Sequence, residues 1–224
     1  MDAKANAALE EFRAEVCHAP CVPEIPLEDN TPKKLKAANI PKRYQGATFE
    51  NLRLKDCPPQ VQDMAKKARS YACALHQNVK NGTGLLFFGE VGRMKTTLAC
   101  CVAREAIKQG RSVYFISMPE LLDTMLTMSR NRDNSELKRF EKKIKDTTLL
   151  ILDDFGAEYP QDWVLNKVDA IITHRYNEML PVIITTNLLP TEIRARYVTR
   201  VFDRLRSTSI LLGTYGDSLR QEVK

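Results

Sequence analysis

A buried strand, a glycine-containing loop and a helix follow one another without interruption between residues 84 and 110 of this 224-residue chain. The apolar run GLLFFG (84–89) predicts the strand, GEVGRMKTT (89–97) the loop, and LACCVAREAIKQG (98–110) a helix that ends at Gly110. A strand that delivers a loop directly to a helix N-terminus is typical of α/β folds.

Three more apolar runs predict buried strands, and helical patterns lie between them. We expect the strands within 112–117, 147–154 and 181–187, and the helices within 58–81, 119–128 and 163–180. Strands that alternate with helices in this way predict an α/β fold, with a parallel sheet covered by helices on both faces.

The loop matches the phosphate-binding pattern G-x-x-x-x-G-K-[ST] at Gly89, Lys95 and Thr96, but Met94 stands where the pattern has its second glycine. Free backbone N–H groups and the helix dipole favour anions at such a loop. We expect Lys95 to reach the outer phosphates of ATP and the Thr96 hydroxyl to hold Mg²⁺. The expected nucleotide-binding residues are Gly89, Glu90, Val91, Gly92, Arg93, Met94, Lys95, Thr96 and Thr97.

Met94 is expected to weaken this site without abolishing it. Glycine is used here because the backbone comes close to phosphate, often in a conformation that other residues adopt at a cost of about 1–3 kcal/mol. If that cost falls entirely on binding, affinity falls roughly 5- to 150-fold. We therefore expect ATP and Mg²⁺ to bind, with hydrolysis slow or dependent on a partner, and Met94→Gly to tighten binding.

Polar residues end two of the later strands. Asp153 is expected to hold Mg²⁺ directly or through water, and Asp154 to polarise the attacking water. Asn187, after the strand VIITT, can hydrogen-bond the γ-phosphate or that water. The alternative is that Asp153 and Asp154 are solvated turn residues, and the upstream phosphate loop favours the functional interpretation.

The composition is that of an ordinary soluble protein, with 43% hydrophobic and 28% charged residues. Basic residues exceed acidic ones (34 − 28 = +6), a mild indication of a polyanionic partner. No apolar run approaches the roughly 18–20 residues that span a bilayer. The N-terminus lacks an export signal, so we expect a cytoplasmic protein with reduced cysteines. Cys17 and Cys21 invite a metal interpretation, but no second ligand pair lies nearby.

These motifs, in this order, resemble the AAA+ ATPases of the DnaC/DnaI/IstB group. The resemblance extends from about Ile40 to the C-terminus, through IPKRYQGATFENL, GEVGRMKTTLA, LLILDDFGAE, THRYNEMLPVIITTNL, RVFDRLR and DSLR. It implies an AAA+ P-loop NTPase domain over residues 41–224. Residues 1–40 would form a short N-terminal extension, helical and then proline-interrupted, that binds a partner.

The resemblance also gives roles to arginines near the C-terminus. Arg204 is similar to an arginine finger, supplied to the ATP of a neighbouring subunit, and this implies a homo-oligomer. Arg220 is similar to the sensor arginine that contacts nucleotide in its own subunit. A guanidinium gives permanently charged, bidentate contacts to developing phosphate charge. From the residues alone, Arg200 or Arg206 could take the place of Arg204.

In function, the resemblance implies an ATP-dependent loader that binds a replicative DNA helicase and delivers it to single-stranded DNA. One alternative is an IstB-like helper ATPase that delivers a transposase to target DNA. Another is an adaptor that binds ATP as a switch with little hydrolysis. A pull-down that recovers a helicase or a transposase separates the first two, and phosphate release separates the third.

The segment 129–146 is dense in basic residues at helical spacing, with Leu137, Phe140 and Ile144 as the expected packing face. In helicase loaders an insertion in this region lines a channel for single-stranded DNA. The alternative is a solvated helix in which Glu136 and Glu141 are the charge partners of neighbouring basic residues. DNA contacts here would be made mainly to the backbone and would weaken with salt.

Overall fold

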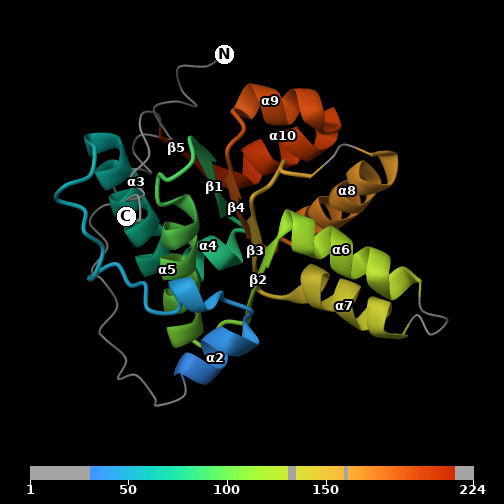
Figure 1. Ribbon diagram of the computed structural model, residues 1–224, viewed down its shortest axis with the longest axis horizontal. Helices are drawn as coiled ribbons and strands as arrows, with labels where there is room; N and C mark the ends of the chain where they lie inside the picture. The colour runs from blue at the N-terminus through green and yellow to red at the C-terminus, as the bar shows by residue number, and fades with distance from the viewer. Residues whose placement is uncertain (1–30, 131–134, 159–160, 215–224) are drawn as a thin grey trace, which may run out of the picture.

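Five parallel strands form the central sheet of the structure, a computed structural model that describes residues 31–130, 135–158 and 161–214 (Figure 1). The order across the sheet is β2-β3-β4-β1-β5. The strands are β1 (Gly84–Gly89), β2 (Val113–Ser117), β3 (Leu149–Asp153), β4 (Val182–Thr186) and β5 (Ser209–Thr214). The first four confirm the predicted strands. Strand β5 was not predicted, and it follows a helix directly, without a turn between them.

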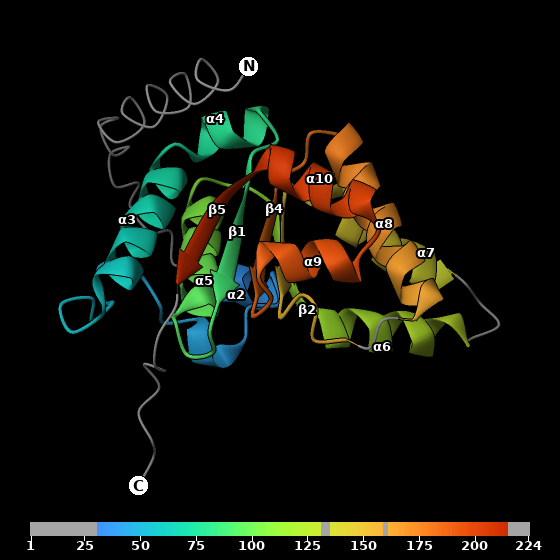
Figure 2. The same cartoon turned by 90° about the horizontal axis from the view of Figure 1, so that it is seen from above.

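Helices cover both faces of the sheet, as predicted (Figure 2). One face carries α2 (Thr31–Ala37), α3 (Pro59–Cys73), α4 (Leu75–Lys80) and α5 (Lys95–Lys108), with the short helix η1 (Lys42–Tyr44) nearby. The other carries α6 (Met118–Ser129), α7 (Ser135–Asp146), α8 (Asp162–Asn177), α9 (Pro190–Arg196) and α10 (Thr199–Thr208). Strands β3 and β4 are buried along their whole length, which explains their continuous apolar sequences.

The helix predicted over 58–81 is wrong in one respect, because it is two helices that meet at Ala74. The backbone of Ala74 leaves the helical region, with φ −90° and ψ 19°. The buried side chain of Asn78 donates through Nδ2 to the carbonyl of Tyr71 at 3.0 Å. A side-chain amide that takes a helical carbonyl competes with the backbone ladder, and this accounts for the break.

Residues 31–40 pack against the sheet, although the sequence analysis assigned them to the N-terminal segment. Leu35, Ala38 and Ile40 are at most 4% exposed and belong to the core on the α5 side. Ala38 O accepts a hydrogen bond from Phe115 N at 2.9 Å, and Asn39 Nδ2 donates to Phe115 O at 3.0 Å. Phe115 lies in β2, so this segment pairs with the outer edge of an edge strand.

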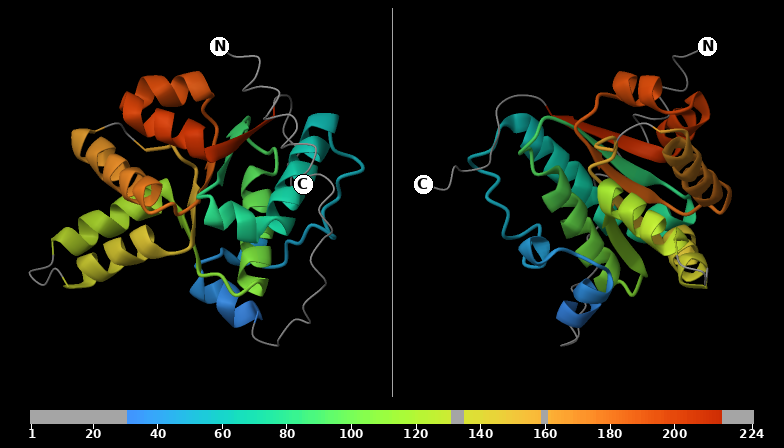
Figure 3. Two further views of the ribbon diagram at one scale, coloured as in Figure 1. Left: turned by 180° about the vertical axis from the view of Figure 1, so that it is seen from behind. Right: turned by 45° about the vertical axis from the view of Figure 1, so that its right-hand side comes forward.

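Helices α6 and α7 lie side by side at one end of the molecule (Figure 3). The predicted packing face of α7 is confirmed: Ile144 is fully buried, and Leu137 and Phe140 pack against the same core. Glu141 pairs with Lys167 of α8 at 2.8 Å rather than with its own helix. None of the helices in the described ranges is long and apolar enough to cross a membrane. The predicted N-terminal helix, Cys17, Cys21 and Arg220 lie outside these ranges.

Candidate nucleotide-binding site

The loop between β1 and α5 has the backbone conformation expected of a phosphate loop. Met94 has φ 61° and ψ 10°, so this non-glycine residue lies in the left-handed region, a conformation that favours glycine. Its side chain is half-buried and packs against the core beside α5. Met94 Sδ also lies 3.9 Å from Cys57 Sγ. The methionine therefore adds packing at the place where it adds strain.

Lys95, the first residue of α5, is almost completely buried. Its Nζ donates to the carbonyls of Gly89 at 2.7 Å and Glu90 at 2.6 Å, and to Asn187 Oδ1 at 2.8 Å. The lysine thus joins the loop to the residue that follows β4. Phosphate oxygens would compete with these acceptors for the same ammonium protons.

Thr96 and Asp153 meet at the carboxyl ends of the strands. Thr96 Oγ1 donates to Asp153 Oδ1 at 2.8 Å, and Thr185 Oγ1 donates to the same oxygen at 2.5 Å. Neighbouring ligands of an octahedral Mg²⁺ at 2.0–2.1 Å lie about 2.9 Å apart. A hydroxyl and a carboxylate oxygen at this separation therefore fit a magnesium site, with direct or water-mediated contact.

The electrostatic environment of Asp153 opposes its ionisation in the protein alone. Burial raises the pKa of this carboxyl above its ordinary value of 3.8, and the neighbouring Asp154 raises it further. Hydrogen bonds from Thr185 and Thr96 and the positive charge of Lys95 lower the pKa of Asp153, but less than burial and Asp154 raise it. A bound cation would favour the ionised form, so the site gains from a metal ion.

Asp154 is exposed to the cleft, whereas its neighbour Asp153 points inward. Its φ of 52° turns the chain out of the strand, and its N–H is bonded to Thr185 Oγ1 at 3.1 Å. Asn187 lines the same cleft. The structure therefore brings the loop, Asp153, Asp154 and Asn187 close together at the carboxyl ends of the strands.

A cleft of about 770 Å³ opens over the phosphate loop, which is within the range of about 300–1,000 Å³ found for ligand sites. Its other wall comes from the segment between α2 and α3, and the sequence analysis assigned no site residue there. The residues on that wall are Arg43, Tyr44, Arg53, Asp56 and Cys57. Only the resemblance of residues 40–52 to the AAA+ group pointed to this segment.

The three arginines of α10 lie outside this cleft, since none of them lines it. Arg200 binds Asp169 of α8 through Nε at 2.8 Å and Nη2 at 2.6 Å, and these bonds hold the pKa of Asp169 below its ordinary value. Arg204 Nη1 donates to Thr173 Oγ1 at 2.5 Å and to Asp169 Oδ1 at 3.4 Å. Arg206 is exposed, and it makes no ion pair with the described part of the chain.

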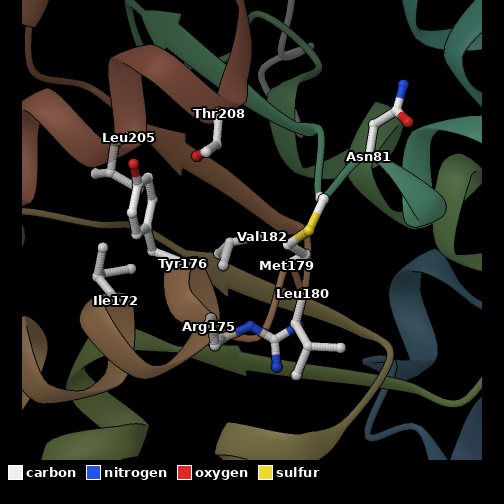
Figure 4. Close-up of a pocket in the computed structure, with 10 residues that line it drawn as sticks. Asn81, Ile172, Arg175, Tyr176, Met179, Leu180, Val182, Leu205 and Thr208 are labelled. Carbon is white, nitrogen blue, oxygen red and sulfur yellow. The ribbon is translucent and has the colours of Figure 1, made fainter.

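A second, much smaller cavity of about 40 Å³ lies at the opposite end of the sheet, beside Arg175 (Figure 4). Its lining includes Val182, which begins β4, and Thr208, which precedes β5. Arg175 is completely buried and donates to four carbonyls, those of Ile144, Lys145, Thr148 and Pro181. Arg175 therefore links α8 to the end of α7 and to the residues that precede β3 and β4. The cavity beside it is too small for a nucleotide.

Several solved structures share this fold. The crystal structure of the DnaC helicase loader matches 77% of the chain and 99% of its own length, with 26% identity and a TM-score of 0.67. AMPPCP-bound DnaA from Aquifex aeolicus matches 79% of the chain and 51% of its own, with a TM-score of 0.63 at 19% identity. A sheet of this order with a lysine-bearing loop after β1 therefore places the chain in the AAA+ class of P-loop proteins.

Sequence comparison narrows the class to one family. The family of IstB-like ATP binding proteins matches residues 32–224, and the chain belongs to it. The replicative helicase loader DnaC of Escherichia coli (strain K12) is 26% identical over 181 residues, which are 80% of this chain and 71% of DnaC. The replicative helicase loader DnaI of Bacillus subtilis (strain 168) is 26% identical over 164 residues, 73% of this chain and 51% of DnaI.

Proposed function

We propose that this protein is an ATPase that binds a replicative DNA helicase and delivers it to single-stranded DNA. The observation that carries the proposal is the convergence of Lys95, Thr96 and Asp153 beside a nucleotide-sized cleft. The similarity to loaders named DnaC and DnaI supports the helicase as the partner. We expect the protein to bind the replicative helicase in the cytoplasm.

Each residue of the site has a distinct task in the proposed reaction. The backbone N–H groups of residues 89–97 and the ammonium of Lys95 hold the phosphates and offset their charge. Thr96 and Asp153 are the proposed magnesium ligands, and bound Mg²⁺ would neutralise charge on the outer phosphates. Asp154 orients the attacking water and accepts its proton, and Asn187 holds the γ-phosphate or that water.

Hydrolysis is proposed to need a second copy of the chain. Arg204 is proposed to act on the ATP of the neighbouring subunit, and Arg220 on nucleotide in its own. Within a single chain, Arg204 is held by Thr173 and Asp169 and lies away from the cleft. An arginine in trans would supply charge that each subunit lacks, so turnover is expected to be slow until the oligomer forms.

Titration with a fluorescent ATP analogue tests the nucleotide site. We expect Mg²⁺-dependent binding by the natural protein and a loss of at least tenfold in Lys95→Ala, since a buried charged contact to phosphate is removed. Lys108→Ala is the matched control, because Lys108 lies at the far end of α5 and pairs with Glu105. Absence of binding at millimolar nucleotide would overturn the proposal.

Co-purification tests the partner. We expect a hexameric replicative helicase to be recovered with the protein, more strongly with ATP than without it. The family name IstB supports a second candidate, a transposition helper, and recovery of a transposase instead of a helicase would favour it. A third candidate is an ATP-binding adaptor, and it would be favoured if no phosphate is released with helicase and single-stranded DNA present.

A further inference from the structure

A buried carboxylate lies a few residues beyond the proposed magnesium and water-binding aspartates. Glu158 is 7% exposed, and both of its carboxylate oxygens accept hydrogen bonds. Oε2 accepts from Gly156 N at 3.1 Å, and Oε1 accepts from the hydroxyl of Tyr197. The turn between Asp154 and Glu158 is defined by positive φ angles at Asp154 and Gly156. Glu158 is therefore placed by the same turn that exposes Asp154.

Tyr197 lies at the junction of the two helices that follow β4. It is the C-cap residue of α9, and only Val198 separates it from α10. The residue is 4% exposed, and its ring stacks on Phe155, with ring centroids 4.5 Å apart. Phe155 is itself fixed to β4, because its N–H donates to Thr185 O at 2.8 Å. One face of Tyr197 thus touches the turn after β3, and its backbone leads into the arginine-bearing helix.

Burial and the Glu158 carboxylate raise the pKa of the Tyr197 hydroxyl, so it remains a donor at neutral pH. The Arg196 guanidinium, close to the same hydroxyl, acts in the opposite direction. The hydrogen bond between Tyr197 and Glu158 therefore joins the turn after β3 to the end of α9, and removal of one partner of such a buried polar link is costly.

We infer that Glu158 and Tyr197 are positioning residues that couple the aspartates after β3 to the placement of α10, and hence to the arginine offered to a neighbouring subunit. This inference rests on the proposed function. A second connection runs in parallel, because α8 follows the same turn and its Asp169 holds both Arg200 and Arg204. Nucleotide and Mg²⁺ bound in one subunit would thereby set the position of Arg204, which is proposed to act on the ATP of the neighbouring subunit.

Hydrogen exchange of the full-length protein, with and without a non-hydrolysable ATP analogue and Mg²⁺, tests the coupling. We expect the analogue to change exchange in peptides that cover residues 190–208 of the natural protein. Tyr197→Phe keeps the ring on Phe155 and removes only the hydroxyl, and it is expected to lose that change while binding the analogue within about twofold of the natural affinity. ATP turnover of the assembled protein is expected to fall roughly 2- to 150-fold.

Tyr71→Phe is the matched control, because it removes the hydroxyl hydrogen bond of another buried tyrosine, to Thr83 O at 2.7 Å, and leaves the bond between Tyr197 and Glu158 intact. Glu158→Leu is the second variant, because it removes both acceptor oxygens, and it is expected to reproduce the effect of Tyr197→Phe even if the latter is poorly folded. Bound analogue with unchanged exchange at 190–208, or equal changes in natural and variant proteins, would overturn the coupling alone. Failure of the natural protein to bind the analogue would overturn the proposed function and the coupling together.

Discussion

Met94 combines two opposing effects that substitution can separate. Its left-handed backbone favours glycine, but its side chain packs on the core and against Cys57. Met94→Gly removes both the strain and the packing, whereas Met94→Ala keeps the strain and removes most of the packing. We expect nucleotide to bind Met94→Gly more tightly than Met94→Ala, by up to roughly 150-fold, in the same fluorescence titration. Equal affinities would show that the loop tolerates a side chain at this position without cost.

Asp153 is expected to oppose stability and to support metal binding. Burial raises its pKa in the folded protein, so the folded state favours the protonated carboxyl. The protonated carboxyl therefore contributes to stability below about pH 4, and this contribution is lost as the pH rises through the folded pKa. Asp153→Asn should therefore raise the melting temperature at neutral pH without ligand, and abolish the Mg²⁺ dependence of nucleotide binding. Calorimetry and the titration are the two measurements. A lower melting temperature would show that the hydrogen bonds from the two threonines outweigh burial.

At the scale of the elements, Arg175 is expected to make a large contribution to stability. Its replacement by methionine would leave four carbonyls without this donor, two of them buried, and each buried group that loses its partner costs about 1–3 kcal/mol. We expect Arg175→Met to lower the free energy of unfolding by at least about 3 kcal/mol in urea denaturation. Arg194→Met, on the exposed side of α9, is the control and should change it by less than about 0.5 kcal/mol.

Helix α7 presents Lys138, Arg139 and Lys142 to solvent, while Lys143 lies 3.9 Å over the Tyr114 ring. If α7 binds single-stranded DNA, replacing Lys138, Arg139 and Lys142 by glutamate should weaken binding. The salt dependence should also fall, by roughly 0.7 in logarithmic slope for each phosphate that is no longer neutralised. The same change at Lys33, Lys34 and Lys36 of α2 alters net charge equally and is the control. Equal effects in both variants would assign the result to net charge rather than to α7.

At the scale of the whole molecule, the features that a local sequence pattern determines could be predicted. Strands buried on both faces have continuous apolar sequences, so β1 to β4 could be recognised. Strand β5 could not, because Ile210 and Leu211 are more than a third exposed and no turn marks its start. The cleft wall at Arg43 and Tyr44 depends on the packing of a distant segment, which no local pattern reports.

The same limit applies to the arginines of α10. Their sequence, RVFDRLR, indicates a basic helix, but it does not show that Asp169 of another helix binds two of them. Ion pairs between helices are set by tertiary packing, so Arg200, Arg204 and Arg206 could not be ranked from the residues alone. The structure distinguishes them by their partners: two are held in their own subunit, and Arg206 is exposed.

The bonds between residues 38–39 and Phe115 bear on how far the chain can be shortened. An uncovered edge strand offers unpaired N–H and C=O groups to any other strand, including the same strand of a second molecule. A truncated protein that begins at residue 41, the predicted start of the ATPase domain, would lose this cover from β2. We expect it to aggregate on light scattering at concentrations where a protein that begins at residue 31 stays dispersed. Residues 38–39 thus cover the edge of β2, and we expect them to prevent the pairing of this strand with another molecule.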